Sequence, residues 1–231
     1  MRPAAGEGAA VAGINDLEGE CDLSISPSGE MFVADVENRR LLRFQNGSGD
    51  LVVGNTDARA LFCSPNGVLY VVSRDGRTVA KVVGSTLETV IASESLPPDM
   101  QFEAYRVWVS KEEVIYFLDN LNRNGRILCI NQAESLEPVV VTQLQTECRS
   151  FLYDLFVTDG GTIYVAEGSQ RKVFALHPSS ATFTEVLQCP DGLCPGALLV
   201  HGRSLYVSMI ALRSDTGKVC EYLLPPELQL Q

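Results

Sequence analysis

Charged side chains stand at a repeated position of the sequence, ten residues before an aromatic residue that recurs five times. Asp22, Arg106 and Asp154 occupy three of these positions, and Ala60 and Gly196 occupy the other two. Calcium prefers carboxylate and carbonyl oxygens, so Asp22 and Asp154 could begin a cation site. A guanidinium nearby repels a cation and attracts a carboxylate. We therefore favour an ion pair between Arg106 and Asp154, with Asp22 near water, and predict no metal or other cofactor.

Nucleophilic catalysis lacks a base in this arrangement. The two histidines, His177 and His201, fall in turns expected to lie opposite the end of the fold that carries Asp22 and Asp154. A serine or cysteine nucleophile needs such a base within hydrogen-bond reach. A hydroxyl residue does recur at the end of a short strand in four of the five repeats, but this repetition indicates a role in turns. We therefore predict no catalytic residue.

The seven cysteines do not form a metal or disulfide pattern. Their number is odd, and no two of them are separated by two residues as in structural zinc sites. Cys189 and Cys194 could close a small loop under oxidising conditions, although we favour reduced thiols. Cys21, Cys148 and Cys194 fall in or near connections on one side of the expected fold. A redox or soft-metal role there is not favoured, because nothing nearby would lower a thiol pKa.

The elements that position these residues are repeated strands. The recurring aromatic residues lie in similar segments at intervals of roughly 40 to 50 residues, a period typical of propeller blades. Each is preceded by a short apolar strand and a turn. In the first four repeats two further strand patterns follow, which makes a four-stranded antiparallel sheet. The five aromatic residues are Phe32, Tyr70, Tyr116, Tyr164 and Tyr206.

We therefore predict an all-β fold, a β-propeller of five four-stranded blades. The last repeat has three strands, and residues 9–14 form an apolar segment without a blade of its own. We expect this N-terminal strand to complete the last blade, because closure removes exposed sheet edges. The domain would then span residues 9–225, between a flexible N-terminus (1–8) and a C-terminal tail (226–231). The alternative is an open fragment of a six-bladed protein.

The first repeat, GEMFVADVENRRLLRF, resembles the NHL repeat, in which Asp35, Asn38 and Arg40 occupy patterned positions. The apolar pattern persists in all five repeats, whereas the polar positions vary. The resemblance implies a six-bladed norm and functions that include protein binding, RNA binding and, in related propellers, catalysis. A carboxylate that caps a turn and receives a guanidinium explains these residues structurally, and we expect that role.

Composition excludes several classes of partner. The net charge is −11, and the 18 lysines and arginines are scattered, which disfavours nucleic acid and anionic membranes. No apolar run is long enough to span a membrane, and the N-terminus is a poor signal peptide. We therefore expect a soluble, acidic, monomeric protein and favour the cytoplasm.

The segment SESLPPDMQFEAY, residues 93–105, is the favoured contact region for a partner. Its two prolines limit its conformational entropy, and Met100, Phe102 and Tyr105 offer apolar anchors. The alternative, that these side chains pack over a neighbouring blade, stays open. We interpret the protein as a non-enzymatic scaffold for a protein or peptide. The alternatives are a metal-dependent lactone or ester hydrolase, which the resemblance allows, and a fragment or decayed paralogue without activity of its own.

Overall fold

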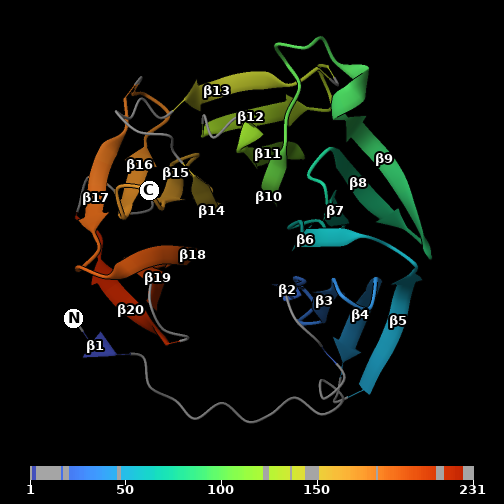
Figure 1. The fold of residues 1–231 in the computed structure, drawn as a ribbon, viewed down its shortest axis with the longest axis horizontal. Helices are drawn as coiled ribbons and strands as arrows, with labels where there is room; N and C mark the ends of the chain where they lie inside the picture. Colours follow the sequence, from blue (N-terminus) through green and yellow to red (C-terminus); the bar gives the residue numbers. More distant parts are fainter. Residues whose placement is uncertain are drawn as a thin grey trace. The chain divides into compact units, whose positions relative to one another are not determined.

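The computed structural model of the chain describes residues 2–3, 17, 21–45, 48–121, 125–135, 137–143, 151–180, 182–211 and 216–225. Within them lie five four-stranded antiparallel sheets (Figure 1), so the fold is the predicted five-bladed β-propeller. These residues also include a short 3₁₀ turn, η1 (Ser93–Ser95). This part of the chain has no helix with the length and apolar character needed to cross a bilayer.

The strands follow one another through the sheets in chain order. Blade 1 contains β2 (Cys21–Ile25), β3 (Met31–Asp35), β4 (Arg40–Gln45) and β5 (Ser48–Gly54); blade 2 contains β6 (Ala58–Cys63), β7 (Leu69–Ser73), β8 (Thr78–Val83) and β9 (Thr86–Ala92). Blade 3 contains β10 (Ala104–Val109), β11 (Val114–Asp119), β12 (Arg126–Asn131) and β13 (Val139–Gln143); blade 4 contains β14 (Leu152–Val157), β15 (Ile163–Glu167), β16 (Lys172–Leu176) and β17 (Thr184–Gln188). Blade 5 contains β18 (Leu193–His201), β19 (Ser204–Ala211), β20 (Gly217–Leu223) and β1 (Arg2–Pro3).

An N-terminal strand completes the last blade, as the sequence predicts. The residues that pair with β20 are Arg2 and Pro3, opposite Glu221 and Cys220. The segment expected to supply this strand, residues 9–14, lies outside the described residues. An N-terminal strand therefore completes the blade, but it lies earlier in the chain than the apolar segment that was expected to form it.

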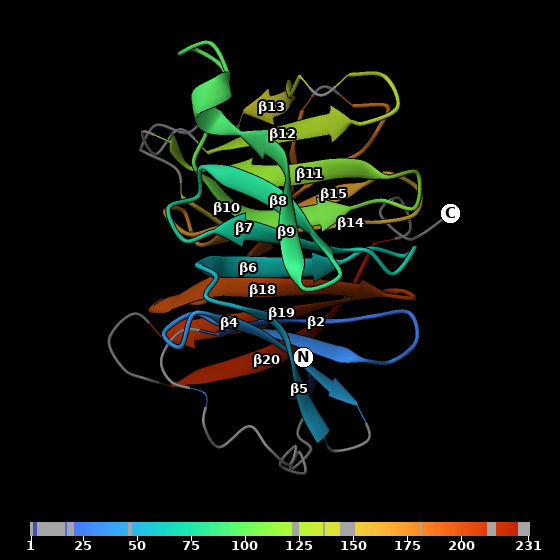
Figure 2. The same cartoon turned by 90° about the vertical axis from the view of Figure 1, so that its right-hand side faces the viewer.

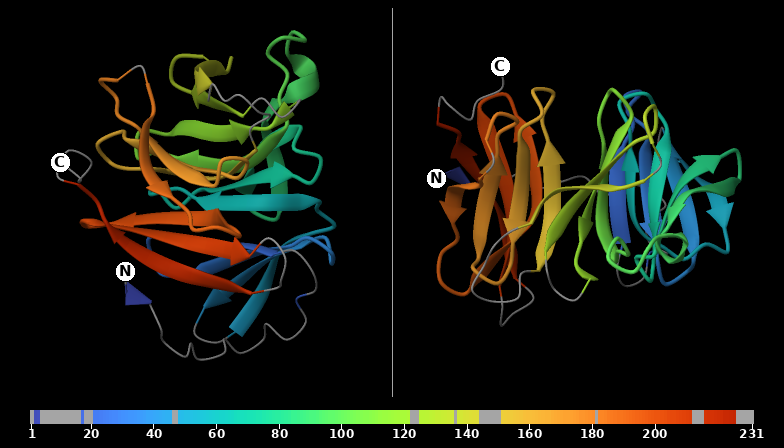
Figure 3. Two further views of the ribbon diagram at one scale, coloured as in Figure 1. Left: turned by 60° about the vertical axis from the view of Figure 1, so that its left-hand side comes forward. Right: turned by 90° about the horizontal axis from the view of Figure 1, so that it is seen from above.

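The chain divides into two compact units, which we describe separately. Residues 8–121 and 127–141 form the first and contain blades 1 and 2 and most of blade 3. Residues 1–7, 122–126 and 142–231 form the second, which contains blades 4 and 5. In the first unit the first strands β2, β6 and β10 are neighbours in chain order (Figure 1). In the second, blades 4 and 5 lie against each other (Figure 3).

Within each unit the blades pack face to face by one rule. We call the face of a blade that packs on the preceding blade its N-side face, and the opposite face its C-side face. The C-side face of blade 1 (Ala34, Leu41, Val53) forms one core with the N-side face of blade 2, which includes Leu61 and Cys63. Blades 2 and 3, and blades 4 and 5, repeat this packing. Each inner blade therefore needs apolar residues on both faces.

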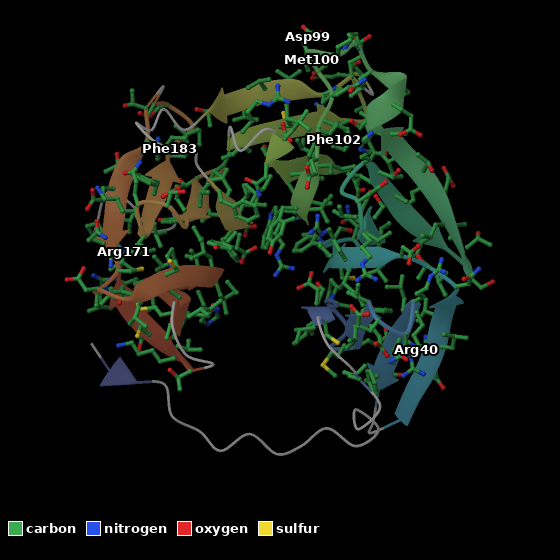
Figure 4. The ribbon with its side chains drawn as sticks, viewed as in Figure 1. Arg40, Asp99, Met100, Phe102, Arg171 and Phe183 are labelled. Carbon is green, nitrogen blue, oxygen red and sulfur yellow. The ribbon has the colours of Figure 1, made fainter. Side chains whose placement is uncertain are left out.

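A buried hydrogen-bond acceptor stabilises the turn between the second and third strands of blade 1. Asp35 is fully buried. Its carboxylate accepts hydrogen bonds from Asn38 Nδ2 at 3.0 and 3.1 Å and from Arg40 Nε at 2.8 Å. These three NHL-like residues therefore act together at one corner of the blade, and Figure 4 labels Arg40 there. The geometry explains their spacing without a ligand.

The same role recurs in other blades with different residue types. Ser73 Oγ accepts from Thr78 N at 2.9 Å, and Asp119 Oδ1 accepts from Leu121 N at 2.8 Å. Glu167 is fully buried, and its two carboxylate oxygens accept from the N–H groups of the next turn at 2.9 and 2.6 Å. The sequence motif thus changes between repeats while the hydrogen-bond acceptor remains.

Replacement of the buried acceptor should destabilise the protein more than replacement of an exposed carboxylate. We expect Asp35→Ala to lower the free energy of unfolding by at least about 2 kcal/mol, because it leaves the amide of Asn38 and the guanidinium of Arg40 without their acceptor. Asp50→Ala, which removes an exposed partner of Arg43, should cost less than about 0.5 kcal/mol. Urea unfolding measures both values, and equal losses would contradict the structural role of Asp35.

Candidate functional site

The candidate site lies where the first strands of the blades begin. In β6, β10 and β14 the pairing with the next strand shifts by one residue, at Arg59, Tyr105 and Tyr153. Such bulges bend the strand and redirect a side chain. The strand β2 pairs through Asp22 without a shift. The bulged residues therefore stand immediately before the repeated position that carries Arg106 and Asp154.

Asp22 joins blade 1 to both of the blades that follow. Its Oδ2 accepts from Leu61 N in β6 at 2.9 Å. Its Oδ1 forms an ion pair with Arg106 Nη1 in β10. Both side chains are largely buried, which strengthens the interaction between them. Both carboxylate oxygens of Asp22 are thus engaged by the fold.

Asp154 has a matching role in the other unit. Its Oδ2 accepts from Leu198 N in β18 at 2.7 Å, as Asp22 accepts from Leu61 N. A carboxylate at this repeated position therefore bonds the first strand of the following blade. In blade 1 Ser24 adds a second bond of the same kind, because its Oγ accepts from Cys63 N at 2.9 Å.

The partner of Arg106 within its unit differs from the predicted one. The sequence favoured a pair with Asp154 and left Asp22 near water, whereas the structure pairs Arg106 with Asp22, whose side chain is only 15% exposed. The register explains this contact: β2 and β10 both pack against β6. The Arg106–Asp154 pair would join residues of different units and stays a prediction.

Arg59, which was not among the predicted site residues, also belongs to this cluster. Its guanidinium lies over the ring of Tyr105, 5.0 Å from the centroid, a cation–π arrangement. Both residues are half-buried. A signal was available: Arg59, Tyr105 and Tyr153 all lie eleven residues before the recurring aromatic residue. Together Asp22, Arg59, Tyr105 and Arg106 form what we call the first-strand cluster.

The segment expected to contact a partner divides into a buried part and an exposed part. Phe102 is buried and packs on Phe117 with ring centroids 4.8 Å apart; it therefore takes the alternative role, packing within the core. Tyr105 belongs to β10 and to the first-strand cluster. Met100 is half-buried, beside the exposed Asp99. Figure 4 shows Asp99 and Met100 at the outer end of the segment and Phe102 among the strands.

Hydrogen bonds hold this segment in one conformation. Ser93 Oγ accepts from Phe102 N at 2.9 Å in a buried position, directly after β9 (Figure 2). Within the loop, Met100 N donates to Pro97 O at 2.9 Å. At its end, Glu103 N donates to Asp119 Oδ1 at 2.8 Å. The exposed residues Pro97–Asp99 therefore project from a base that these hydrogen bonds hold in place. We call the whole segment, residues 93–103, the 93–103 loop.

Burial raises the pKa of several cysteine thiols in the described part of the chain. Burial raises the pKa of Cys189 to about 11 and also raises the pKa of Cys194. Burial and the negative charge of Asp35 raise the pKa of the exposed Cys21. Cys148 lies outside the described residues. His177 directly follows β16 and His201 is the last residue of β18; both are exposed, and His177 Nδ1 lies 2.7 Å from Ser179 Oγ.

No group of three or more histidine, cysteine, aspartate or glutamate side chains suited to a metal ion occurs among the described residues. The donor chemistry of the first-strand cluster agrees with this result. Asp22 supplies the only carboxylate of the cluster, and a guanidinium already contacts it. As described, the cluster is a structural ion pair with an adjacent cation–π contact.

Comparison with known proteins shows the fold and leaves the activity undefined. No family model matches the sequence, and no curated protein matches it. A gluconolactonase from Xanthomonas campestris superposes with a TM-score of 0.70 at 13% identity, over 91% of this chain and 78% of that one. The virginiamycin B lyase of Staphylococcus aureus gives 0.60 at 15% identity, over 87% and 69%.

A third similar structure is YCF48 bound to D1 peptide, with a TM-score of 0.61 at 13% identity. The match covers 85% of this chain and 62% of that one. At such identities the three structures establish the class of protein alone. The chain is a β-propeller, and its structural neighbours include enzymes as well as a propeller described with a peptide.

Calcium should leave the stability of the protein unchanged. We expect the same melting temperature in excess EDTA and in millimolar calcium, because the two oxygens of Asp22 already contact Leu61 N and Arg106. Calcium at about a hundred times its dissociation constant would add about 2.7 kcal/mol. Differential scanning calorimetry would detect this gain as a shift of several degrees, and such a shift would contradict the structural assignment of Asp22.

The 93–103 loop should depend on its buried aromatic residue. We expect Phe102→Ala to lower the free energy of unfolding by about 3–5 kcal/mol through loss of a packed core side chain. Met100→Ala, two residues away and half-buried, should cost no more than about 1.5 kcal/mol. Chemical denaturation monitored by circular dichroism compares the two variants. A cost for Met100→Ala as large as that for Phe102→Ala would show that the tip also belongs to the core.

Proposed function

We propose that this β-propeller is a non-enzymatic scaffold that binds a protein or peptide partner through the 93–103 loop. The observation that carries the proposal is the division of this loop into a buried base and an exposed tip. Phe102 and Ser93 are buried, whereas Pro97, Pro98 and Asp99 are exposed. A loop already held in one conformation loses little entropy when it binds.

The composition of the tip fits recognition of an extended or helical segment. Two consecutive prolines restrict the backbone, and Met100 provides an adaptable apolar side chain next to the carboxylate of Asp99. Such a surface favours a ligand with an apolar side chain. The structural similarity to YCF48 bound to D1 peptide supports the proposal only as an example of a propeller described with a peptide.

The alternative functions have less support from particular residues. The gluconolactonase similarity at 13% identity suggests a hydrolase as an alternative, but Asp22, the carboxylate of the first-strand cluster, is bonded to Leu61 N and Arg106. A chain without activity of its own would not need an exposed loop fixed by buried hydrogen bonds. The binding scaffold therefore accounts for more of the observed contacts.

Selection from a displayed library of random peptides tests the proposal. We expect the selected peptides to bind the wild-type protein and to lose at least about tenfold in affinity, about 1.4 kcal/mol, for Met100→Glu. The matched control is Leu87→Glu, which adds the same charge at an exposed apolar residue near the start of β9. That control should retain binding.

Two results would overturn the proposed function. One is failure to enrich any peptide on wild-type protein whose folding is confirmed by circular dichroism. The other is enrichment of peptides whose affinity is unchanged by Met100→Glu, since a different surface would then bind them. Isothermal titration calorimetry provides the affinities for all three proteins.

A further inference from the structure

The turn between β10 and β11 differs at one backbone position from the equivalent turns of the other blades. Each of these turns, between the first and second strands of a blade, contains one residue with a positive φ angle. Four of the five residues are glycines: Gly29, Gly67, Gly161 and Gly202. The fifth, in blade 3, is Glu113, with a φ of 61°. A residue with a Cβ is disfavoured in this conformation, so the contacts of the Glu113 side chain need an explanation.

The Glu113 carboxylate bridges blades 2 and 3. Its Oε2 accepts from Tyr70 Oη of β7 at 2.8 Å, and its Oε1 accepts from Asn66 Nδ2, between β6 and β7, at 2.5 Å. Tyr70 is 2% exposed, and its hydroxyl also accepts from Gln132 Nε2 at 3.3 Å. Asn66 Nδ2 makes a second bond, to Lys111 O at 3.2 Å. We call the bonds from Asn66 and Tyr70 to Glu113 the Glu113 bridge; it lies entirely within the first compact unit.

Asn66 is followed directly by Gly67, a pair of residues that favours loss of the asparagine amide. Glycine has no side chain to hinder its backbone nitrogen, so this nitrogen can approach the asparagine Cγ. Both residues are exposed. In the folded chain, however, Gly67 N donates to Ser64 O at 2.8 Å, and the Glu113 bridge holds the amide of Asn66. The reaction therefore has to start from a conformation in which these bonds are open.

We propose that Asn66 is a deamidation site and that its conversion to aspartate breaks the Glu113 bridge. In this reaction Gly67 N attacks Asn66 Cγ and forms a cyclic imide. The Cγ–Nδ2 bond breaks, and the amide group leaves as ammonia with the proton of Gly67 N. Water then opens one of the two imide C–N bonds, which gives aspartate or isoaspartate. The reaction is a hydrolysis, so it needs no oxidant or reductant.

The aspartate product places two carboxylates where the folded chain has a donor and an acceptor. Asn66 Nδ2 lies 2.5 Å from Glu113 Oε1, so a carboxylate oxygen in place of this nitrogen repels Glu113. The product also loses the donor to Lys111 O. If the repulsion displaces Glu113, the buried hydroxyl of Tyr70 loses its acceptor. A modification at one exposed turn thereby weakens the contact between two blades.

An aspartate substitution tests the effect of the product. Asn66→Asp should lower the urea midpoint of unfolding relative to the wild type. The matched control is Asn55→Asp, which adds the same charge at an exposed asparagine directly after β5 and should leave the midpoint unchanged. In the Glu113→Gln background, Asn66→Asp should lower the midpoint by less than about half as much, because a neutral amide can donate to the new carboxylate.

Peptide mapping by mass spectrometry, after incubation at mildly alkaline pH, tests the modification itself. We expect wild-type protein to convert at Asn66, and Glu113→Gly to convert at least about three times faster, because the amide is then held less firmly. This variant introduces the residue that the other four turns carry, so it removes the bridge without straining the backbone. Mapping separates this site from the two other Asn–Gly pairs of the sequence, Asn46–Gly47 and Asn124–Gly125.

A second control and a second preparation exclude indirect effects. Glu112→Gln removes the charge of the exposed carboxylate next to Glu113, outside the bridge, and should convert at the wild-type rate. If Asn66→Asp does not fold, wild-type protein that is deamidated after folding and isolated by anion exchange gives the same comparison of urea midpoints. Circular dichroism establishes folding before each measurement.

Two results would overturn the inference. One is an intact Asn66 amide in both the wild type and Glu113→Gly after an incubation that converts the urea-unfolded chain. The other is a urea midpoint for Asn66→Asp equal to that of the wild type, or a decrease that Glu113→Gln leaves unchanged, since repulsion by Glu113 would then not be its cause. Neither result bears on peptide binding by the 93–103 loop.

Discussion

The constraint on which this structure depends is that a sheet with two apolar faces must bury both of them. The inner strands show the constraint directly: every residue of β15, Ile163–Glu167, is buried. A single twisted sheet cannot shield such a strand from water, so each blade relies on its neighbours. Most of the stabilising free energy therefore comes from contacts between blades, and hydrogen bonds within a blade mainly specify the register of its strands.

Polar residues at the blade junctions follow from the same constraint. When two apolar faces approach, the first strand of the following blade brings backbone N–H groups out of water, and each needs an acceptor. Asp22 and Asp154 supply that acceptor to Leu61 N and Leu198 N. A carboxylate thus recurs for structural reasons at the position where a ligand would otherwise be expected. Repetition between blades is what distinguishes this role from catalysis, which needs an asymmetric set of groups.

The sequence predicted the five-bladed fold because its determinants are local. Strand alternation, turn residues and the recurring aromatic residue all act within a few residues, and the N-terminal completion of blade 5 followed from the missing fourth strand. The residues that pair with β20 could not be predicted, because Arg2 and Pro3 have no apolar pattern. The polar motif of blade 1 also did not reveal the equivalent residues of the other blades. Ser73 and Glu167 accept hydrogen bonds at the same turn as Asp35 does, but with different side chains.

The candidate site depended on relations between distant residues, and these were less accessible to sequence reasoning. The pairing of Arg106 with Asp22 requires that β2, β6 and β10 stand in a particular register, which the bulges at Arg59 and Tyr105 help to set. A shift of one residue would exchange the two faces of a strand. Similarly, Met100 and Phe102 differ little in hydrophobicity, yet Phe102 is buried against Phe117 whereas Met100 is half-buried. The core buries Phe102 and fixes the backbone on either side of Met100. The packing that builds the blade therefore also determines which part of the loop remains available to a partner.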